Sequence, residues 1–455
     1  MQSFFMSPKA KQLFKEFDKV SEQDWIAKIE KDLKGKPLSI LNYNPEKELK
    51  TKAYFHSDNA TLYPPIEGSE NNVWFVQELF EGNDNKKLNT IILDHLLKGV
   101  DGIQLKVNDK TNLKDVLKDV GLQYVSTELL IQTKNNWQQI KELLKTDYNN
   151  FSMSFNVLTL GTTKGKFDYN LDDFYEFYQK FKENKNLKNI HVDGLTFGFA
   201  GASSVQEMAI ALTQLSEYTQ YLLNKGVKLN DIINQTYTTL SVNEEYFTNI
   251  AKFRAYKLLI RHFFKSFDEQ IEIDKVHINA VTNKRHIAKN DRYNNLLRAT
   301  TQAMSAILGG VNNIQVTPFD TTDEISVRMA RNIQLVLKEE AYFDKVSDPA
   351  AGAYYIEDLT DQLVEQTWRL FLEIEENGGY ITSLTDNNIQ TKINENKQLL
   401  VEQLNAGKKT FLGVNKYPST LEQWIDVEPK DIKGQAFEPL QEFILEQHYQ
   451  KPTEQ

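Results

Sequence analysis

The sequence predicts an α/β fold in which β-strands and α-helices alternate along most of the chain. Short apolar runs recur, and longer stretches with apolar residues three or four positions apart separate them. The strand candidates are residues 103–107, 125–131, 153–158, 190–195, 238–242, 276–280 and 314–317, with a weaker eighth at 345–347. Eight strand–helix units over about 260 residues match the size of a closed parallel barrel. A doubly wound open sheet alternates in the same way, so periodicity alone leaves both possible.

The first forty residues predict a helical arm. Ser21 and Asp24 have the spacing of a capping box, although Asp is a weaker partner there than Glu. Gly35 and Pro37 end this helix. Its apolar positions are Trp25, Ile26, Ile29 and Leu33, and a similar stripe of Leu13, Phe14 and Phe17 precedes it. Such an arm packs either on its own domain or on a partner.

Two later helices have clear boundaries in the sequence. Ser204 followed by Glu207 predicts a capping box, and Gly226 predicts the end of that helix. Asp291 predicts the N-cap of the second helix, and a Gly-Gly pair at 309–310 predicts its end. The residues expected to face inward are Val205, Met208, Leu212, Leu215, Thr219 and Leu222 in the first helix, and Leu296, Leu297, Thr300, Met304 and Ile307 in the second.

The composition argues against several classes of function. There are 53 Lys and Arg against 63 Asp and Glu, so the net charge is −10 and no basic excess exists to neutralise nucleic-acid phosphates. The absence of cysteine excludes thiol catalysis, disulfides and thiolate metal sites, and it fits a reducing, cytoplasmic compartment. No apolar run reaches the roughly 18–20 residues that span a bilayer, and the N-terminus lacks a signal-peptide pattern. No glycine-rich nucleotide-binding loop is present.

The ends of the expected strands carry few acids or bases. Side chains at such ends build the site of a barrel. Here they are Asn156, Thr196, Asn243, Asn279 and Asp320. His286 is the one histidine that follows such an end, and the seven histidines show no metal-ligand spacing. Each histidine is therefore expected in a structural or surface role.

Two further motifs are interpreted as structural. Arg328 and Arg331 lie one helical turn apart and make either ion pairs or a phosphate site, with ion pairs favoured. Asp348-Pro349 followed by Gly352 is a turn by its composition, and we expect it to define the fold rather than to act in catalysis.

Several motifs, taken in order, resemble the methylmalonyl-CoA mutase family. The resemblance is dense between Asp291 and Gly379, extends with varying strength from Gly194 to Tyr417, and is weak before that. Its segments include Leu308-Gly-Gly-Val311, Val316-Thr-Pro-Phe-Asp320, Asp348-Pro-Ala-Ala-Gly-Ala-Tyr-Tyr-Ile-Glu357, Glu375-Glu-Asn-Gly-Gly379 and Gly413-Val-Asn-Lys-Tyr417. These segments resemble the last third of that family's coenzyme-A-binding barrel.

The resemblance implies a (β/α)8 TIM-type barrel at residues 41–380, whose bore admits the pantetheine chain of a thioester. A helical arm at 1–40 and a helical linker with a C-terminal extension at 381–455 complete the expected organisation. Catalytic members of the family also carry a flavodoxin-like domain that holds adenosylcobalamin. They isomerise (R)-methylmalonyl-CoA and succinyl-CoA by a radical rearrangement.

The chain departs from catalytic members in three places. First, it stops at Gln455 and lacks the cobalt-binding Asp-x-His-x-x-Gly loop, so no cobalamin-binding domain is expected. Second, catalytic members read Gly-Tyr-His at the end of the fourth strand, where this chain has Gly194, Leu195 and Thr196. Leu cannot replace the phenol, and Thr cannot act as an imidazole acid.

The third departure lies near the start of the barrel. Catalytic members have Arg-Gln-Tyr there, and the expected equivalents in this chain are Val76, Gln77 and Glu78. Loss of the Arg removes a bidentate contact to the substrate carboxylate. A Glu at that place is expected to repel the carboxylate.

These losses resemble the small subunit of the heterodimeric bacterial enzyme, in which a non-catalytic barrel pairs with a large, cobalamin-binding catalytic subunit. The resemblance implies that this chain stabilises such a partner in propionate metabolism. It also implies that the partner carries adenosylcobalamin and binds the acyl-CoA. No catalytic, cofactor-binding or metal-binding residue is therefore assigned to this chain, and neither nucleic acid nor membrane is an expected partner.

Other interpretations stay open at this point. One is a catalytic barrel subunit whose cobalamin domain is a separate chain, and Thr196 argues against it because such a subunit needs the His. Another is a mutase assembly partner without an enzymatic role. The missing nucleotide-binding loop argues against an energy-dependent chaperone. An unrelated barrel enzyme is disfavoured by the dense block of motifs.

Overall fold

The computed structural model describes residues 16, 18, 20–57, 61–64, 66, 72–184, 186–419 and 433–450. The predicted stripe at Leu13, Phe14 and Phe17 lies outside these residues.

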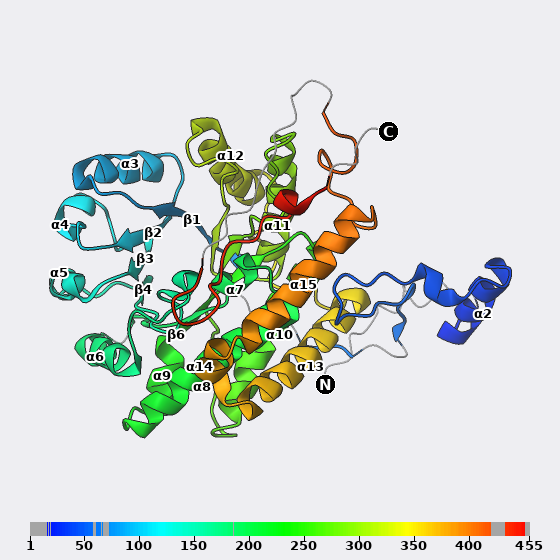
Figure 1. Cartoon of the computed structure of the whole chain (residues 1–455), viewed down its shortest axis with the longest axis horizontal. Helices are drawn as coiled ribbons and strands as arrows, with labels where there is room; N and C mark the ends of the chain where they lie inside the picture. Colours follow the sequence, from blue (N-terminus) through cyan, green and yellow to red (C-terminus); the bar gives the residue numbers. More distant parts are fainter. Residues whose placement is uncertain are drawn as a thin grey trace.

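Eight parallel strands form a single ring (Figure 1). They are β1 (Phe75–Phe80), β2 (Gly102–Val107), β3 (Ser126–Ile131), β4 (Phe151–Ser154), β5 (Ile190–Asp193), β6 (Thr236–Val242), β7 (Ile278–Thr282) and β8 (Asn313–Gln315). Neighbours in sequence pair from β1 to β4 and from β5 to β8, and β1 pairs with β8. A single parallel bridge between Ser152 of β4 and Lys188, just before β5, closes the ring. The structure therefore confirms the TIM-type barrel and excludes the open sheet.

Two strand predictions were wrong at the ends of the barrel. The first strand, β1, was missed because it contains the consecutive polar residues Gln77 and Glu78, which interrupt an apolar run. Residues 345–347 are not a strand, and they lie in a region of turns and bends that continues to Gly352. The strand before Gly194 is consequently the fifth strand of the barrel rather than the fourth.

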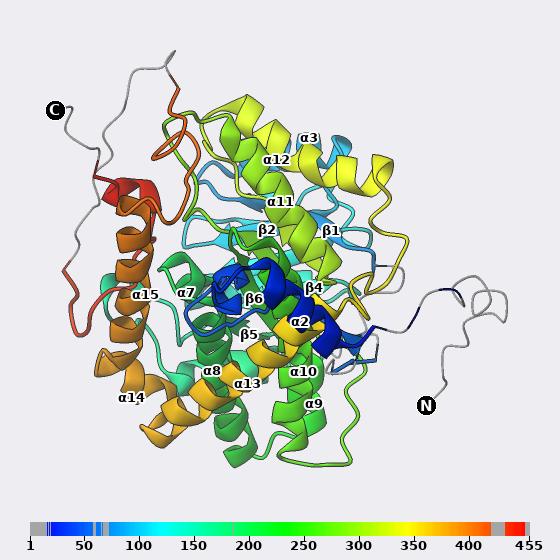
Figure 2. The same ribbon diagram turned by 90° about the vertical axis from the view of Figure 1, so that its right-hand side faces the viewer.

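Helices surround the ring and connect its strands. They are α3 (Asn85–Leu97), α4 (Leu113–Val116), α5 (Trp137–Leu143), α6 (Leu171–Phe181), α7 (Leu195–Phe199), α8 (Ser204–Asn224), α9 (Leu229–Gln235), α10 (Tyr246–Lys265), α11 (Asn294–Leu308) and α12 (Glu324–Leu335), which continues as a π-helical turn (Val336–Glu340). Beyond the barrel follow α13 (Tyr354–Glu376), α14 (Gly379–Thr385) and α15 (Asn388–Asn405). Figure 2 shows α13 beside α10 and α8, with α15 rising at the edge of the molecule. Short 3-10 turns occur at Leu38–Leu41, Lys134–Asn136, Thr162–Lys164 and Leu445–His448.

The predicted helix boundaries are correct to within a few residues. The cap of α8 lies one residue earlier than predicted, since Ser203 and Gln206 form the capping box, while Gly226 with φ +80° ends the helix as expected. Asp291 does not cap α11, which begins after Tyr293 without a side-chain cap. Leu297, predicted to face inward, is 66% exposed.

The described part of the N-terminal arm is the helix α2 (Glu22–Asp32), which stands apart from the barrel in Figure 1. The predicted capping box of Ser21 and Asp24 is present. Trp25 stacks on Tyr54 with ring centroids 4.3 Å apart, and Ile26 and Ile29 stay half-buried. The apolar side of α2 is thus only partly covered by its own chain.

A buried charge cluster fastens α13 to the barrel helices. The guanidinium of Arg254, on α10, contacts the carboxylates of Asp348 and Glu357, and all three side chains are at most 3% exposed. The second oxygen of Asp348 accepts the backbone N–H of Ile66 at 2.8 Å. These contacts agree with the interpretation of the Asp348 turn as structural.

We expect the variant Arg254→Gln to lose about 3–5 kcal/mol of unfolding free energy, because it leaves two buried carboxylates without their cation. Lys98→Gln is the matched control, since Lys98 pairs with Asp94 on the open surface of α3, where such pairs contribute little. Urea unfolding followed by circular dichroism measures both. Equal losses in the two variants would show that the cluster does not hold α13.

Candidate functional site

The space enclosed by the eight strands, here called the bore, is filled by polar side chains. Barrels of this type usually fill the bore with layers of Val, Ile and Leu. In this chain the inward-facing side chains include Gln77, Gln104, Glu128, Asn279 and Asn313, each at most 5% exposed. They come from five different strands, so the polar character extends around the ring.

Glu128, on β3, is the centre of this polar filling and is 1% exposed. Its Oε2 atom accepts hydrogen bonds from Gln104 Nε2 at 2.9 Å, Gln77 Nε2 at 3.3 Å and Asn279 Nδ2 at 3.3 Å. A buried carboxylate is costly unless donors surround it. Three amide groups from β1, β2 and β7 provide them here.

A second group of polar side chains lies around His191 of β5. Its Nδ1 lies 2.7 Å from Ser154 Oγ, its Nε2 lies 2.9 Å from Thr239 Oγ1, and its ring stacks on Tyr237 at 4.6 Å. Burial lowers the pKa of His191, against the opposing influence of the Asp193 and Glu128 carboxylates. Burial and the nearby Glu128 raise the pKa of the Tyr237 phenol well above its usual value. The ring and the phenol are therefore both held neutral at ordinary pH.

The expected substrate-facing residues Leu195 and Thr196 lie at the start of α7, just after β5. Thr196 donates its hydroxyl to Asp193 Oδ2 at 2.6 Å, and its backbone N–H donates to Asp193 Oδ1 at 3.0 Å. Its side chain is thus bound within its own loop. Gly198 in the same turn lies so close to β6 that a Cβ atom would approach Ser241 Oγ to 2.2 Å.

Val76 and Glu78 do not face the bore. Strand residues alternate between two faces, and Gln77 occupies the inward face of β1. Glu78 instead lies 2.5 Å from His95 Nδ1 on α3 and 3.3 Å from Arg331 Nη1 on α12. The reasoning that Glu78 repels a substrate carboxylate is therefore wrong, because its side chain points to the helix layer. The same contact confirms an ion pair for Arg331, whereas Arg328 is exposed.

The remaining strand-end candidates bind their own chain. Asn156 donates to the His191 carbonyl at 3.0 Å, Asn243 donates to Glu46 Oε1 at 3.2 Å, and Asp320 accepts from Thr322 in the loop before α12. Asn279 belongs to the bore. The structure thus scatters these residues and does not assemble them into one reactive centre.

A charged cluster on the rim, meaning the loops that follow the strands, was not predicted. Glu244 contacts Arg285 at 3.0 Å, His286 at 2.9 Å and Lys409 at 2.9 Å. Burial opposes ionisation of Glu244, but these positive neighbours outweigh it and hold its pKa well below the usual value. The cluster borders a hollow of about 210 Å³ between the 44–47 segment and α15. Lys409 comes from far along the chain, so no local motif signals it.

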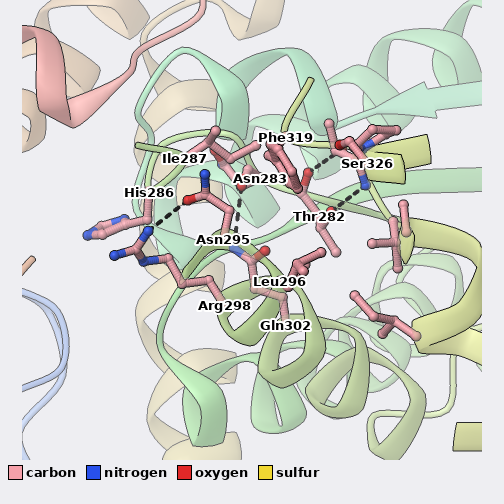
Figure 3. A pocket seen from close by; sticks show the side chains of 16 residues that line it. Thr282, Asn283, His286, Ile287, Asn295, Leu296, Arg298, Gln302, Phe319 and Ser326 are labelled. Carbon is pink, nitrogen blue, oxygen red and sulfur yellow. Dashed lines mark hydrogen bonds between the residues drawn. The ribbon is translucent and has the colours of Figure 1, made fainter. Parts of the chain in front are cut away.

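A crevice between α11 and the loops after β7 and β8 is nearly closed by its own side chains (Figure 3). Arg298 donates to Asn295 Oδ1 at 2.7 Å, and the Thr317 N–H donates to Thr282 Oγ1 at 2.7 Å. Only about 10 Å³ of free volume is left. That is room for no more than one water molecule.

The described ranges of the chain contain neither a metal cluster nor a membrane-spanning helix. There, no group of three or more acidic or histidine side chains is arranged to hold a metal ion. No helix in the same part of the chain has the length and apolar character needed to cross a bilayer.

Comparison with known proteins identifies the family. The family model for methylmalonyl-CoA mutase matches residues 166–454, which is more than half of the chain. The chain belongs to the methylmalonyl-CoA mutase family. It is 32% identical to the methylmalonyl-CoA mutase small subunit of Porphyromonas gingivalis, over 92% of this chain and 73% of that protein.

Two further relatives differ in how much of the chain they match. The methylmalonyl-CoA mutase small subunit of Propionibacterium freudenreichii is 24% identical over 93% of this chain and 73% of its own length. The methylmalonyl-CoA mutase of Escherichia coli is 32% identical over 53% of this chain and 34% of its own length. The two proteins named as small subunits thus match nearly the whole chain, whereas this mutase matches about half.

The buried His191 gives a pH prediction for this mutase-family barrel. Its folded pKa lies below the ordinary value of 6.5, so as pH falls the unfolded chain takes up the proton first and stability is lost. In His191→Asn this loss is absent, and the slope of unfolding free energy below pH 6.5 should be smaller by up to about 1.4 kcal/mol per pH unit. Urea unfolding at several pH values measures the slope. A slope in His191→Asn equal to that of the unaltered chain would contradict the assignment.

Proposed function

We propose that this chain is a non-catalytic small subunit of an adenosylcobalamin-dependent methylmalonyl-CoA mutase, and that it stabilises a larger catalytic subunit. The single observation that carries the proposal is the amide-bound Glu128 at the centre of the bore. A bore that admits a pantetheine chain needs a continuous path along the barrel axis. Here that path is filled by side chains bonded to one another.

The residues around the expected acyl position support the same proposal. Thr196 binds Asp193 and has no ring nitrogen to act as an acid. Leu195 offers no hydroxyl in place of a phenol. The alternative of a catalytic barrel with cobalamin on a separate chain needs an imidazole at position 196 and an open bore, so we do not favour it.

The residues present do not fit a resident cobalamin. A histidine that ligates a metal must present one ring nitrogen to it, while the other commonly binds a carboxylate. His286, the histidine that follows β7 on the rim, has such a carboxylate in Glu244 at 2.9 Å, but both of its ring nitrogens are buried, so neither is presented to a large cofactor. His191 and His277 bind neighbours inside the barrel. We therefore assign the cofactor and the acyl-CoA to the partner.

The functional prediction concerns the chain alone and in complex. Alone, it should bind neither succinyl-CoA nor adenosylcobalamin in a calorimetric titration and should form no succinyl-CoA from methylmalonyl-CoA. Co-expressed with the large mutase subunit of the same source, it should elute as a one-to-one complex with mutase activity. Turnover by the isolated chain, or failure to associate with that subunit, would overturn the proposal.

A second prediction concerns the arm. The half-covered apolar side of α2 is a candidate contact with the partner, because exposed apolar surface commonly marks an interface. Deleting residues 1–35 should weaken a complex that buries about 2,000 Å² or more, while the circular dichroism of the barrel stays unchanged.

Point variants on the two sides of α2 distinguish a direct contact with the partner from a general effect of deleting the arm. Trp25→Ala with Ile29→Ala removes the apolar side of α2, and Lys28→Ala changes its exposed side. Affinity measured by surface plasmon resonance should fall in the first variant only. Undiminished affinity in the deletion variant would show that the arm does not contribute to binding of the partner.

A further inference from the structure

A segment distant from the barrel in sequence lies across its rim. Residues 434–449, here called the lid, run past the loops after β4, β5 and β7, and they are drawn in red in Figure 1. The backbone N–H groups of Leu440, Phe443 and Leu445 donate to the carbonyls of Thr162, Phe199 and Arg285 at 3.1, 2.8 and 2.9 Å. The lid is thereby tied to three separate loops of the rim.

Apolar side chains anchor the lid from below. Phe437, Leu440, Phe443 and Leu445 are each at most 5% exposed. Phe443 and Leu445 belong to a small hydrophobic cluster, separate from the barrel core, together with α15 and the turn at 411–414. Gly165 makes close seating possible, since a Cβ atom there would lie 2.1 Å from the carbonyl of Phe437.

One carboxylate fixes the end of the lid. Glu446 is 4% exposed, and its Oε2 accepts the backbone N–H of Lys289 at 2.7 Å. Its Oε1 accepts the backbone N–H of Asn290 at 3.1 Å and the Asn290 side-chain Nδ2 at 2.8 Å. Two consecutive backbone N–H groups that converge on one carboxylate form an anion-binding nest.

We propose that this nest is a carboxylate-binding site on the rim, and that Glu446 occupies it in cis to latch the lid over the barrel mouth. The nest belongs to the loop after β7, whereas the carboxylate comes from a segment more than 150 positions later. Seating the lid is therefore a binding event within one molecule. A free small carboxylate should occupy the same three donors when the Glu446 side chain is removed.

The same segment supplies a matched comparison. Glu442 carries the same charge four residues earlier, but it pairs with Lys284 at 3.0 Å with both side chains more than a third exposed. Exposed pairs of this kind contribute little, because water screens the two charges. Hydrogen bonds to a buried charge contribute more. The latch thus depends on Glu446 and not on the acidity of the segment.

Hydrogen–deuterium exchange of the full chain tests the latch. In Glu446→Ala the amides of Lys289, Asn290, Phe443 and Leu445 should exchange about 10- to 100-fold faster, the range expected on losing hydrogen bonds to a charged group. Peptides from the strands should exchange as in the unaltered chain. Glu442→Ala should leave the lid unchanged. Unchanged exchange in Glu446→Ala, or acceleration spread equally over the strands, would overturn the proposal.

Addition of acetate tests the binding site itself. In Glu446→Ala, increasing acetate should slow exchange at Lys289 and Asn290 in a saturable way, since its carboxylate takes the place of the missing side chain. Sodium chloride at matched ionic strength is the control. If acetate protects no better than chloride, the nest is not a carboxylate site and Glu446 acts only through packing.

Discussion

The carboxylate of Glu128 constrains the rest of the barrel. A charge at the centre of eight strands needs polar partners, because its removal from water is otherwise too costly. Gln77, Gln104 and Asn279 supply them from three other strands. Opening the bore for a ligand would separate these groups and leave the carboxylate without donors. The polar filling therefore joins four of the strands across the bore.

Buried charges also organise the layer of helices. Lys252 on α10 donates to Glu207 on α8 at 2.6 Å and to the carbonyl of Ser241 on β6 at 2.9 Å. Lys257, five residues further along α10, caps the end of α11 through the carbonyls of Gly309 and Gly310, and burial lowers its pKa to about 7. The two buried lysines of α10 thus bind groups on α8, β6 and the end of α11, and they connect these elements. This use of charge agrees with a subunit whose proposed role is structural.

The sequence predicted the barrel because its apolar runs and helical periods are local features. Seven strands were found, and β1 was missed because Gln77 and Glu78 find their partners on other elements only after folding. The boundary of α8 shifted by one residue because Ser203 and Ser204 offer equally good caps. The face to which each strand side chain points was harder to predict than the location of the strands, because neighbouring residues of a strand point to opposite faces. For that reason the residues equated with substrate contacts, Val76 and Glu78, were placed on the wrong side of β1.

One segment before the strands of the barrel and one after them meet the same rim. Glu46 accepts the backbone N–H of Ser204 at 2.9 Å at the start of α8, and Glu446 occupies the nest after β7. The ribosome makes Glu46 before any strand of the barrel and Glu446 after all of them. During synthesis the Glu46 carboxylate lacks this partner until Ser204 has been made. The lid cannot bind the rim until the residues that follow the last strand have been made. The apolar surface that Phe443 and Leu445 cover is formed by Ala288, α15 and the turn at 411–414, so a nascent chain exposes it late in elongation, and chaperones commonly protect such surfaces.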